Sequence, residues 1–506
     1  MTKHTPEFLR KRASNLSLRS ASMSSSFYST PAPPMPTLLR TDDPASFTKP
    51  FCHFLTENPT VFHAVQYFKD ALGDKGYSEM APRDDWTGKI APGGKYFVTR
   101  NGSSVVAFSV GKAYKPGNGV AIIAGHIDAL TAKLKPVSDK PSRYGYVQLG
   151  VAPYGGALNA TWWDRDLSVG GRVVVRDEQT GKTGVRLVKL DWPIAKVPTL
   201  APHFGVGMMG NNNKETQAVP IIGLDNPDAT AAETIGAAGS FISTQPPRLV
   251  KLIAKELGLK DPSAIVNWEL ELFDTNPATL LGMDREFISA GRIDDKLCSW
   301  AAMQGLLCSE DKDDDGVIRM VVLFDDEEIG SLLRQGARGN FLPSVIERSV
   351  EAMCAASGAS FGPGVLGRTY ASSFLVSADV THAVNPNFAG EYLESHMPRL
   401  NVGVAICADS NGHMTTDSVS TAVLDRVASL RGCTNQVFMI RNDSRSGGTV
   451  GPTISSMLGV RSADCGLPQL SMHSVRATTG ALDPGLGVKF FRAFLEEFER
   501  VDREWH

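Results

Sequence analysis

The chain has 506 residues and a mass of 54.4 kDa, a length that predicts about three domains, or two if one of them is large. Apolar residues make up 42% of it, which is enough to bury a hydrophobic core. The 51 Lys and Arg residues nearly balance the 54 Asp and Glu residues, and this argues against a nucleic-acid partner, because such affinity is built from clustered positive charge.

The sequence shows no signal for a membrane or for secretion. No stretch approaches the roughly 20 apolar residues that a membrane span needs, and the N-terminus lacks the apolar core of a secretory signal. The seven cysteines are scattered and include no Cys-x-x-Cys pair. We therefore expect a soluble chain with reduced thiols that is made in the cytoplasm.

Residues 1–37 differ in composition from the rest of the chain. They carry basic residues, a single acid (Glu7), a serine run and then several prolines. The second half is typical of a linker without fixed structure. The stretch from Pro6 to Leu18 predicts either a short basic amphipathic helix or an unstructured tail.

The first folded part predicts helices and then buried strands. Apolar residues recur at three- and four-residue steps over residues 47–76, which is a helical pattern. Short β runs follow at residues 95–99, 104–110 and 119–124. The last run, GVAIIAG, is apolar throughout and bounded by glycines, as is typical of a buried parallel strand.

The pattern changes between residues 131 and 272. Two β-branched runs flank a polar turn within residues 172–190 and predict a hairpin. Residues 206–240 are rich in Gly, Asn and Ala with little periodicity and predict a long loop, and residues 248–257 predict a helix. We interpret 131–272 as an inserted β-rich domain.

Strands and helices alternate again after residue 268. Buried strands are predicted at residues 268–273, 318–324, 373–378, 403–408 and 436–440, and helices at 297–307 and 488–501. This alternation predicts an α/β domain with a mostly parallel central sheet.

Five segments that end or follow predicted strands offer metal ligands. These ligands are His126 with Asp128, Asp294 with Asp295, Glu327 with Glu328, Asp379 with His382, and His473. Functional groups gather at the carboxyl ends of parallel strands, so residues distant in sequence can meet there. The strand VVLF runs directly into four acids, which repel one another unless cations lie among them.

This residue set predicts a site for two divalent ions. Two imidazoles, three carboxylates and a spare carboxylate suit two ions bridged by one carboxylate. Imidazole combined with carboxylate favours zinc, with manganese or cobalt as alternatives.

Taken together, the segments resemble the aspartyl aminopeptidase family of dinuclear metallopeptidases, and within it the fungal vacuolar aminopeptidase I branch. The resemblance runs from about residue 45 to the end and includes GVAPYGGALNATWWDRDLSVGGR and TLAPHFG of the inserted region. It implies a zinc-aminopeptidase-like α/β catalytic domain in two parts, 38–130 and 273–506, interrupted by a dimerisation domain at 131–272.

The resemblance also implies roles for the site residues. His126 and Asp379 would bind one ion, Glu328 and His473 would bind the other, and Asp294 would bridge both. Glu327 would be the general base, and Asp128 would orient the His126 imidazole. Family resemblance fixes the order of Glu327 and Glu328, so exchanged roles remain an alternative.

The chain departs from acid-specific family members at two places. Asn159, Ala160 and Thr161 stand where those members have a histidine near the DRD motif, and Cys407 stands where a lysine would lie. An acidic substrate side chain would lack its cationic partner, so we predict a preference for apolar N-terminal residues such as leucine. His203, Cys407 and Met472 are the candidate substrate-binding residues.

The resemblance also implies assembly and location. Peptides would be the substrates, dimers would assemble into a tetrahedral dodecamer, and the 1–37 tail would be a propeptide read by an autophagy receptor for delivery to the vacuole. Residence in the cytosol is the first alternative location, and mitochondria are the second, because the Arg- and Ser-rich, acid-poor tail also matches a transit peptide. The alternative functions are an acid-specific aspartyl aminopeptidase, a dinuclear carboxypeptidase or amidase of similar catalytic core, and an inactive autophagy cargo or scaffold.

Overall fold

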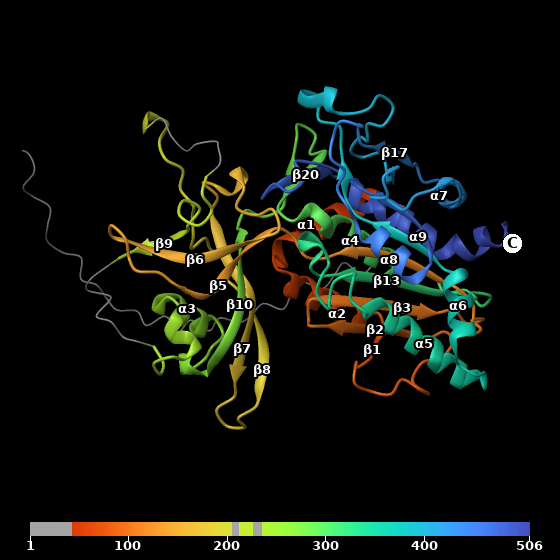
Figure 1. Ribbon diagram of the computed structural model, residues 1–506, viewed down its shortest axis with the longest axis horizontal. Coiled ribbons are helices and arrows are strands. Elements are labelled where there is room, and N and C mark those ends of the chain that lie inside the picture. The colour runs from red at the N-terminus through yellow and green to blue at the C-terminus, as the bar shows by residue number, and fades with distance from the viewer. Residues whose placement is uncertain (1–42, 205–211, 226–234, 506) are drawn as a thin grey trace, which may run out of the picture. The chain divides into compact units, whose positions relative to one another are not determined.

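The computed structural model describes residues 43–204, 212–225 and 235–505 (Figure 1). The basic tail predicted at residues 1–37 lies outside these residues. Across the described ranges, no helix is long and apolar enough to cross a membrane.

A nine-stranded sheet forms the centre of the described α/β region (Figure 1). Its strands lie in the order β1 (Ser78–Glu79), β2 (Lys95–Arg100), β3 (Ser104–Val110), β13 (Ile318–Phe324), β4 (Val120–His126), β14 (Phe374–Ala378), β18 (Arg461–Gly466), β16 (Ala405–Ala408) and β17 (Gln436–Met439). The pairs β1–β2, β13–β4, β4–β14, β14–β18 and β16–β17 are parallel, and the other three are antiparallel. The sheet is therefore mostly parallel, as the sequence predicts. The prediction that residues 268–273 form one of the α/β strands was wrong, because these residues belong to β10 (Ile265–Asp274), which pairs antiparallel with strands of another sheet.

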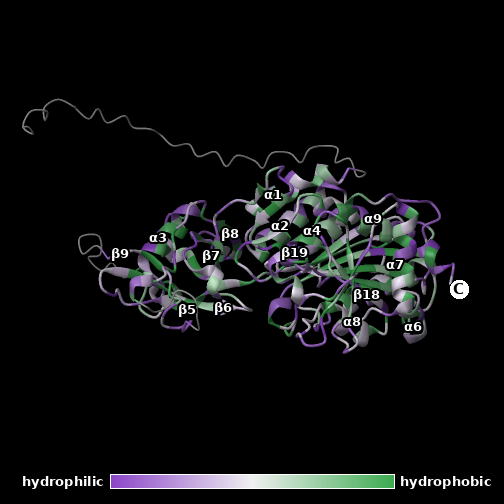
Figure 2. Ribbon diagram, turned by 90° about the horizontal axis from the view of Figure 1, so that it is seen from above, coloured by the Kyte–Doolittle hydropathy of each residue, from purple (hydrophilic) through white to green (hydrophobic). Residues whose placement is uncertain are grey.

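The strands of this sheet are buried on both faces, because side chains alternate between two separate cores. In β4, Ile123 packs into one core and Ile122 into the other. The first core is covered by α1 (Thr48–Glu57), α2 (Val61–Asp74), α4 (Ile293–Leu307), α7 (Ser418–Arg431) and α9 (Asp483–Asp502). The second is covered by α5 (Phe341–Ser357), α6 (Pro363–Ala371) and α8 (Val450–Leu458). Apolar ribbon lies inside and polar ribbon outside (Figure 2).

The helical pattern over residues 47–76 folds as two helices, with a short 3₁₀ helix η1 (Pro44–Phe47) before them. The chain breaks at Pro59, which has no N–H to donate to a helix. Thr60 then begins α2 as its N-cap, because its side chain accepts a hydrogen bond from the His63 N–H.

A six-stranded antiparallel sheet is built from strands between Thr131 and Asp274. Its order is β8 (Thr183–Lys189), β7 (Leu167–Arg176), β10 (Ile265–Asp274), β5 (Thr131–Asp139), β6 (Tyr146–Tyr154) and β9 (Ile221–Leu224). The hairpin predicted at 172–190 is confirmed as β7–β8. Helix α3 (Pro247–Glu256) shares a core with this sheet, together with η2 (Ala160–Trp162) and η4 (Phe241–Thr244). The boundaries 131–272 of an inserted domain stay a prediction.

The prediction of a continuous loop over 206–240 was wrong at one place. Residues Ile221–Leu224 form strand β9, which pairs with β6 near Tyr146. Four residues are too few to show a periodic pattern, and pairing with β6 rather than local propensity makes them a strand.

A third, five-stranded sheet carries the remaining strands. Its order is β11 (Thr279–Leu281), β12 (Phe287–Ala290), β20 (Ala477–Gly480), β19 (Pro468–Leu470) and β15 (Thr381–His382). The short helices η3 (Pro202–Phe204), η5 (Pro262–Ala264), η6 (Glu327–Ile329) and η7 (Pro386–Glu391) lie in connections. This sheet places the β19–β20 loop, residues 471–476, where it can meet the end of the central sheet.

Candidate metal centre

The carboxyl ends of three adjacent strands of the central sheet position one half of the site. His126 is the last residue of β4, Asp379 directly follows β14, and Glu327 begins η6 just beyond β13. Because β13, β4 and β14 run parallel side by side, these three segments end at one edge. The predicted alternation of strands and helices thus brings together residues separated by more than 200 positions in the sequence.

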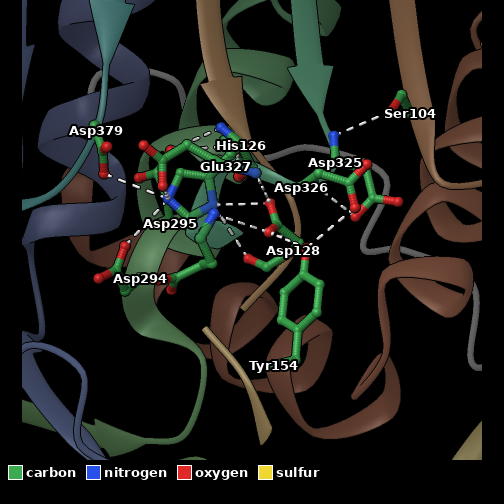
Figure 3. A network of polar contacts seen from close by, with 12 residues as sticks. Ser104, His126, Asp128, Tyr154, Asp294, Asp295, Asp325, Asp326, Glu327 and Asp379 are labelled. Atoms are coloured by element: carbon green, nitrogen blue, oxygen red, sulfur yellow. Dashed lines mark hydrogen bonds and ion pairs between the residues drawn. The ribbon is translucent and has the colours of Figure 1, made fainter. Parts of the chain in front are cut away.

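The His126 imidazole is the centre of one cluster (Figure 3). Its Nε2 lies 3.3 Å from Asp294 Oδ1, 3.6 Å from Asp379 Oδ1 and 3.9 Å from Glu327 Oε2. His126 is buried, whereas the three carboxylates are partly open. Three carboxylate oxygens therefore surround one imidazole nitrogen.

Asp294 turns its second oxygen to another histidine. Its Oδ2 lies 3.6 Å from His473 Nε2, and the same nitrogen lies 3.7 Å from Glu328 Oε2. Asp294 stands in the first turn of α4 with non-helical backbone angles (φ −77°, ψ 117°). One carboxylate thus joins two clusters, each with its own histidine.

Asp295 also lies within ligand distance of one cluster, although the sequence analysis assigns it no separate role. Ligand atoms of His126, Asp295 and Asp379 lie within 4.8 Å of one another. The same holds for ligand atoms of Asp294, Glu328 and His473. However, Asp295 Oδ2 already faces the His126 backbone N–H at 3.3 Å. Asp294, in contrast, turns one oxygen to each of the two imidazoles, as a bridging ligand would require.

Asp128 lies behind His126 and organises the site (Figure 3). Its Oδ1 lies 3.2 Å from His126 Nδ1, so a proton on Nδ1 would leave Nε2 free to bind a metal. The same carboxylate accepts the backbone N–H groups of Glu327 (3.3 Å) and Glu328 (3.2 Å). Tyr154, the last residue of β6, donates its hydroxyl to Asp128 Oδ2 at 2.7 Å. Sequence reasoning missed Tyr154, since no local pattern signals a contact between the end of β6 and the connection from β4 to β5.

The electrostatics of the cluster favour bound positive charge or protonated carboxyl groups. Burial raises the pKa of Glu327 to about 8 and that of Glu328 to about 9, and neighbouring carboxylates act in the same direction. Burial alone would lower the pKa of His126, but Asp379 and the other carboxylates around it raise that pKa well above its ordinary value. Without cations, these carboxylates cannot all be ionised near neutral pH.

The residues present fit a pair of divalent cations. Over the ranges that the structure describes, the buried Oε1 of Glu328 has no hydrogen-bond partner, although a buried carboxylate oxygen normally finds one. Imidazole nitrogens and carboxylate oxygens form the donor set that zinc takes in catalytic sites. Two imidazoles bridged by one carboxylate match the ligand pattern of two-metal sites.

The candidate substrate residues differ in their placement. Cys407 in β16 is buried among Phe438, Tyr392, Met414 and Ile440. Met472 is half-buried beside His473 and packs against the main core. His203 in η3 is exposed, and the described contacts do not bring it to the two clusters.

Comparisons of the sequence match most of the chain. The family model for aminopeptidase I zinc metalloproteases (M18) matches residues 54–495. The vacuolar aminopeptidase 1 of Saccharomyces cerevisiae is 41% identical over 463 residues, which are 90% of this chain and 89% of that protein. The aspartyl aminopeptidase of Aspergillus oryzae is 40% identical over 481 residues, which are 90% and 96% of the two chains.

Comparisons of the fold agree with those of the sequence. The Chaetomium thermophilum mApe1 structure has a TM-score of 0.86 and 63% identity, and the match covers 92% of this chain and 100% of that one. The S. cerevisiae mApe1 dodecamer structure has a TM-score of 0.80 and 37% identity, and the match covers 91% of this chain and 99% of that one. The structure of an Ape4 and Nbr1 complex has a TM-score of 0.85 and 39% identity, and the match covers 91% of this chain and 88% of that one.

Proposed function

Because the chain belongs to the aminopeptidase I zinc metalloprotease family (M18), we propose that it holds two divalent ions and removes apolar residues from the N-termini of peptides. Metal-dependent aminopeptidase activity follows from the family itself. The number of ions is inferred from one observation, the Asp294 carboxylate that turns one oxygen toward His126 and the other toward His473.

The proposed ligands divide between the two ions. His126 and Asp379 would bind one ion, Glu328 and His473 the other, and Asp294 both. Zinc fits this donor set, with manganese or cobalt as alternatives. When bound, the ions would lower the pKa of a shared water and polarise the scissile carbonyl.

Glu327 is the proposed general base. It lies beside both clusters, and its Oε2 is 3.9 Å from His126 Nε2, the longest of the three carboxylate distances at that nitrogen. Its carboxylate would take a proton from the attacking water and return it to the leaving amine. Asp128 holds Glu327 in place through the Glu327 backbone N–H, so the base and the His126 imidazole share one anchor.

The surroundings of Cys407 support an apolar substrate preference. The side chains packed with Cys407 are aromatic or aliphatic, and Phe438 lies opposite it in the next strand. The Phe438 ring lies 5.6 Å from that of His382, three residues beyond Asp379. A substrate carboxylate placed there would find no cation among these neighbours, and an unpaired buried carboxylate is costly. An acid-specific activity is the alternative, since relatives carry that name.

Assembly and location are proposed from the relatives. Since the S. cerevisiae mApe1 structure is a dodecamer, we propose the same assembly here, with the 131–272 domain making dimer contacts. We also propose vacuolar delivery through residues 1–37 and an autophagy receptor, with cytosolic residence as the alternative. Deleting residues 1–37 and following the location of the protein tests this role, and unchanged vacuolar arrival would contradict it.

Hydrolysis of chromogenic amides tests the proposed function. We expect the leucyl amide to be cleaved faster than the aspartyl and lysyl amides, and activity to disappear on chelation and return with zinc, manganese or cobalt. An N-terminally blocked leucyl peptide serves as the control and should not be cleaved. Faster release from the aspartyl amide would refute the apolar preference, and activity that survives full metal removal would refute the metal centre.

A further inference from the structure

A short segment that follows β6 contacts the loop that carries His473. This segment, residues 154–161, joins strand β6 of the six-stranded sheet to η2. Asn159 Nδ2 donates a 2.9 Å hydrogen bond to the His473 carbonyl, and Thr161 Oγ1 accepts a 2.9 Å hydrogen bond from the Val475 N–H. The backbone on both sides of Ser474 is thus fixed to residues more than 300 positions earlier in the chain.

His473 is the ligand that most needs such a support. Its side chain is 54% exposed, whereas that of Glu328 is 5% exposed. It also has a φ of +62°, in the left-handed region that residues other than glycine rarely adopt. Neither burial nor regular secondary structure holds its imidazole beside Asp294, so the hydrogen bonds of the loop must do so.

Asn159 has two separable functions in this contact. Its Oδ1 accepts the N–H (3.0 Å) and the hydroxyl (2.7 Å) of Thr161, which makes Asn159 the N-cap of η2. Its Nδ2 donates to the carbonyls of His473 and, at 3.2 Å, Gly156. A side chain with the oxygen but without the amide N–H would keep the cap and lose the bond to His473.

We propose that Asn159 is a positioning residue for His473 and thereby controls the affinity of one ion of the pair. This inference rests on the proposed two-ion centre. Among the described hydrogen bonds, Asn159 reaches no side-chain atom of a proposed ligand, and its amide N–H contacts the His473 loop only at the His473 carbonyl. Partners of this kind orient a ligand, and their loss weakens metal binding by roughly 10- to 100-fold. The ion at His126 and Asp379 is held by other segments, so its affinity should not change.

Two substitutions isolate the amide donor. Asn159→Asp keeps a capping oxygen and nearly the same shape, while Asn159→Ser keeps a capping oxygen and adds no charge. The matched control is Asn385→Asp, because Asn385 is also the N-cap of a 3₁₀ helix, with its side chain accepting the Asn387 N–H at 3.0 Å. A purely structural effect of losing an asparagine at a cap would appear in the control as well.

Zinc titration of the metal-free protein, in competition with a chromogenic chelator, is the test. We expect both Asn159 variants to bind the zinc ion that His473→Ala loses about 10-fold less tightly than wild type, with the other ion and the melting temperature of the metal-free protein unchanged. Unchanged affinity for both ions would overturn the proposal. Equal weakening of both ions, or a lower melting temperature of the metal-free protein, would also overturn it, because the role would then be structural.

The same titration distinguishes a failure of the Asn159 proposal from a failure of the two-ion centre on which it rests. Wild type should take up two zinc ions and His473→Ala one. If wild type takes up only one ion, the two-ion centre fails. If wild type and His473→Ala behave as expected while both Asn159 variants match wild type, only the role of Asn159 fails.

Discussion

Tyr154 donates a 2.7 Å hydrogen bond to Asp128, and through it a strand of the six-stranded sheet contacts the metal centre (Figure 3). Asp128 in turn faces His126 Nδ1 and accepts the backbone N–H groups of Glu327 and Glu328. A single hydroxyl therefore supports the carboxylate that contacts both the proposed metal ligand His126 and the proposed general base Glu327.

Tyr154→Phe should lower kcat/KM about 10-fold, because Asp128 loses a hydrogen bond and holds His126 and Glu327 less firmly. Steady-state hydrolysis of a leucyl amide measures this change. Tyr146→Phe is the matched control, since Tyr146 begins the same strand but is 44% exposed. Equal activity of the two variants would show that the Tyr154 hydroxyl has no part in the site.

Glu327→Gln and Glu328→Gln should fail in different ways. Loss of a general base costs roughly 100-fold or more in kcat, so Glu327→Gln should lose activity but keep its metal. Glu328→Gln should instead lose metal, because an amide is a poorer ligand than a carboxylate. Metal content measured together with kcat distinguishes the two, with the exposed Glu351→Gln as control. If Glu327→Gln loses metal and Glu328→Gln keeps it, then Glu327 is the metal ligand and Glu328 the general base.

Cys407→Lys should shift the substrate preference toward acidic N-terminal residues. An ammonium group in this apolar cluster would pair with a substrate carboxylate, and a charged hydrogen bond contributes about 1.5 to 3 kcal/mol. The aspartyl-to-leucyl ratio of kcat/KM should therefore rise by roughly 10-fold or more. Cys407→Ser shows the effect of losing the thiol alone. If both variants keep the wild-type ratio, Cys407 does not line the specificity pocket.

His63 should make the fold sensitive to acid. Burial lowers the pKa of His63 to about 4, with help from the positive charges of Lys296 and Lys189. Because the pKa is lower in the folded chain than in the unfolded one, His63 stabilises the fold above pH 6.5, and this stabilisation disappears as the pH falls toward 4. The loss is roughly 3 kcal/mol at most. The melting temperature of wild type should fall more between pH 7 and 4 than that of His63→Gln, and parallel curves would contradict this.

The sequence predicts the parts of the site that follow strong apolar strands. His126 ends a strand that is buried on both faces, and Glu327 and Asp379 each follow one, so the strands and their convergence could be predicted. Strand β18 lies inside the same sheet, between β14 and β16, but was missed, because its sequence RSADCG lacks a run of large apolar residues. The buried Asp464 within it is tolerated because Thr415 and Thr449 donate hydrogen bonds to its carboxylate.

The contacts made across the chain could not be predicted. Nothing local indicates that Asn159 reaches the His473 carbonyl, since this contact depends on how two sheets place their loops. Likewise, Asp294 and Asp295 are adjacent acids, and the backbone angles at the start of α4 decide which one turns both oxygens to the histidines. The family resemblance predicts Asp294 as the bridging ligand, and the distances from its two oxygens to the two histidines support this prediction.

Elemental analysis of metal per subunit, with leucyl amide hydrolysis measured on the same samples, tests the two-ion centre most directly. Wild type and the exposed control His53→Ala should each hold two ions and be active. His473→Ala should hold one ion and lose most of its activity, because Asp294 and Glu328 would lack their shared imidazole. Metal content and activity that stay at wild-type levels in His473→Ala would contradict the assignment of the site.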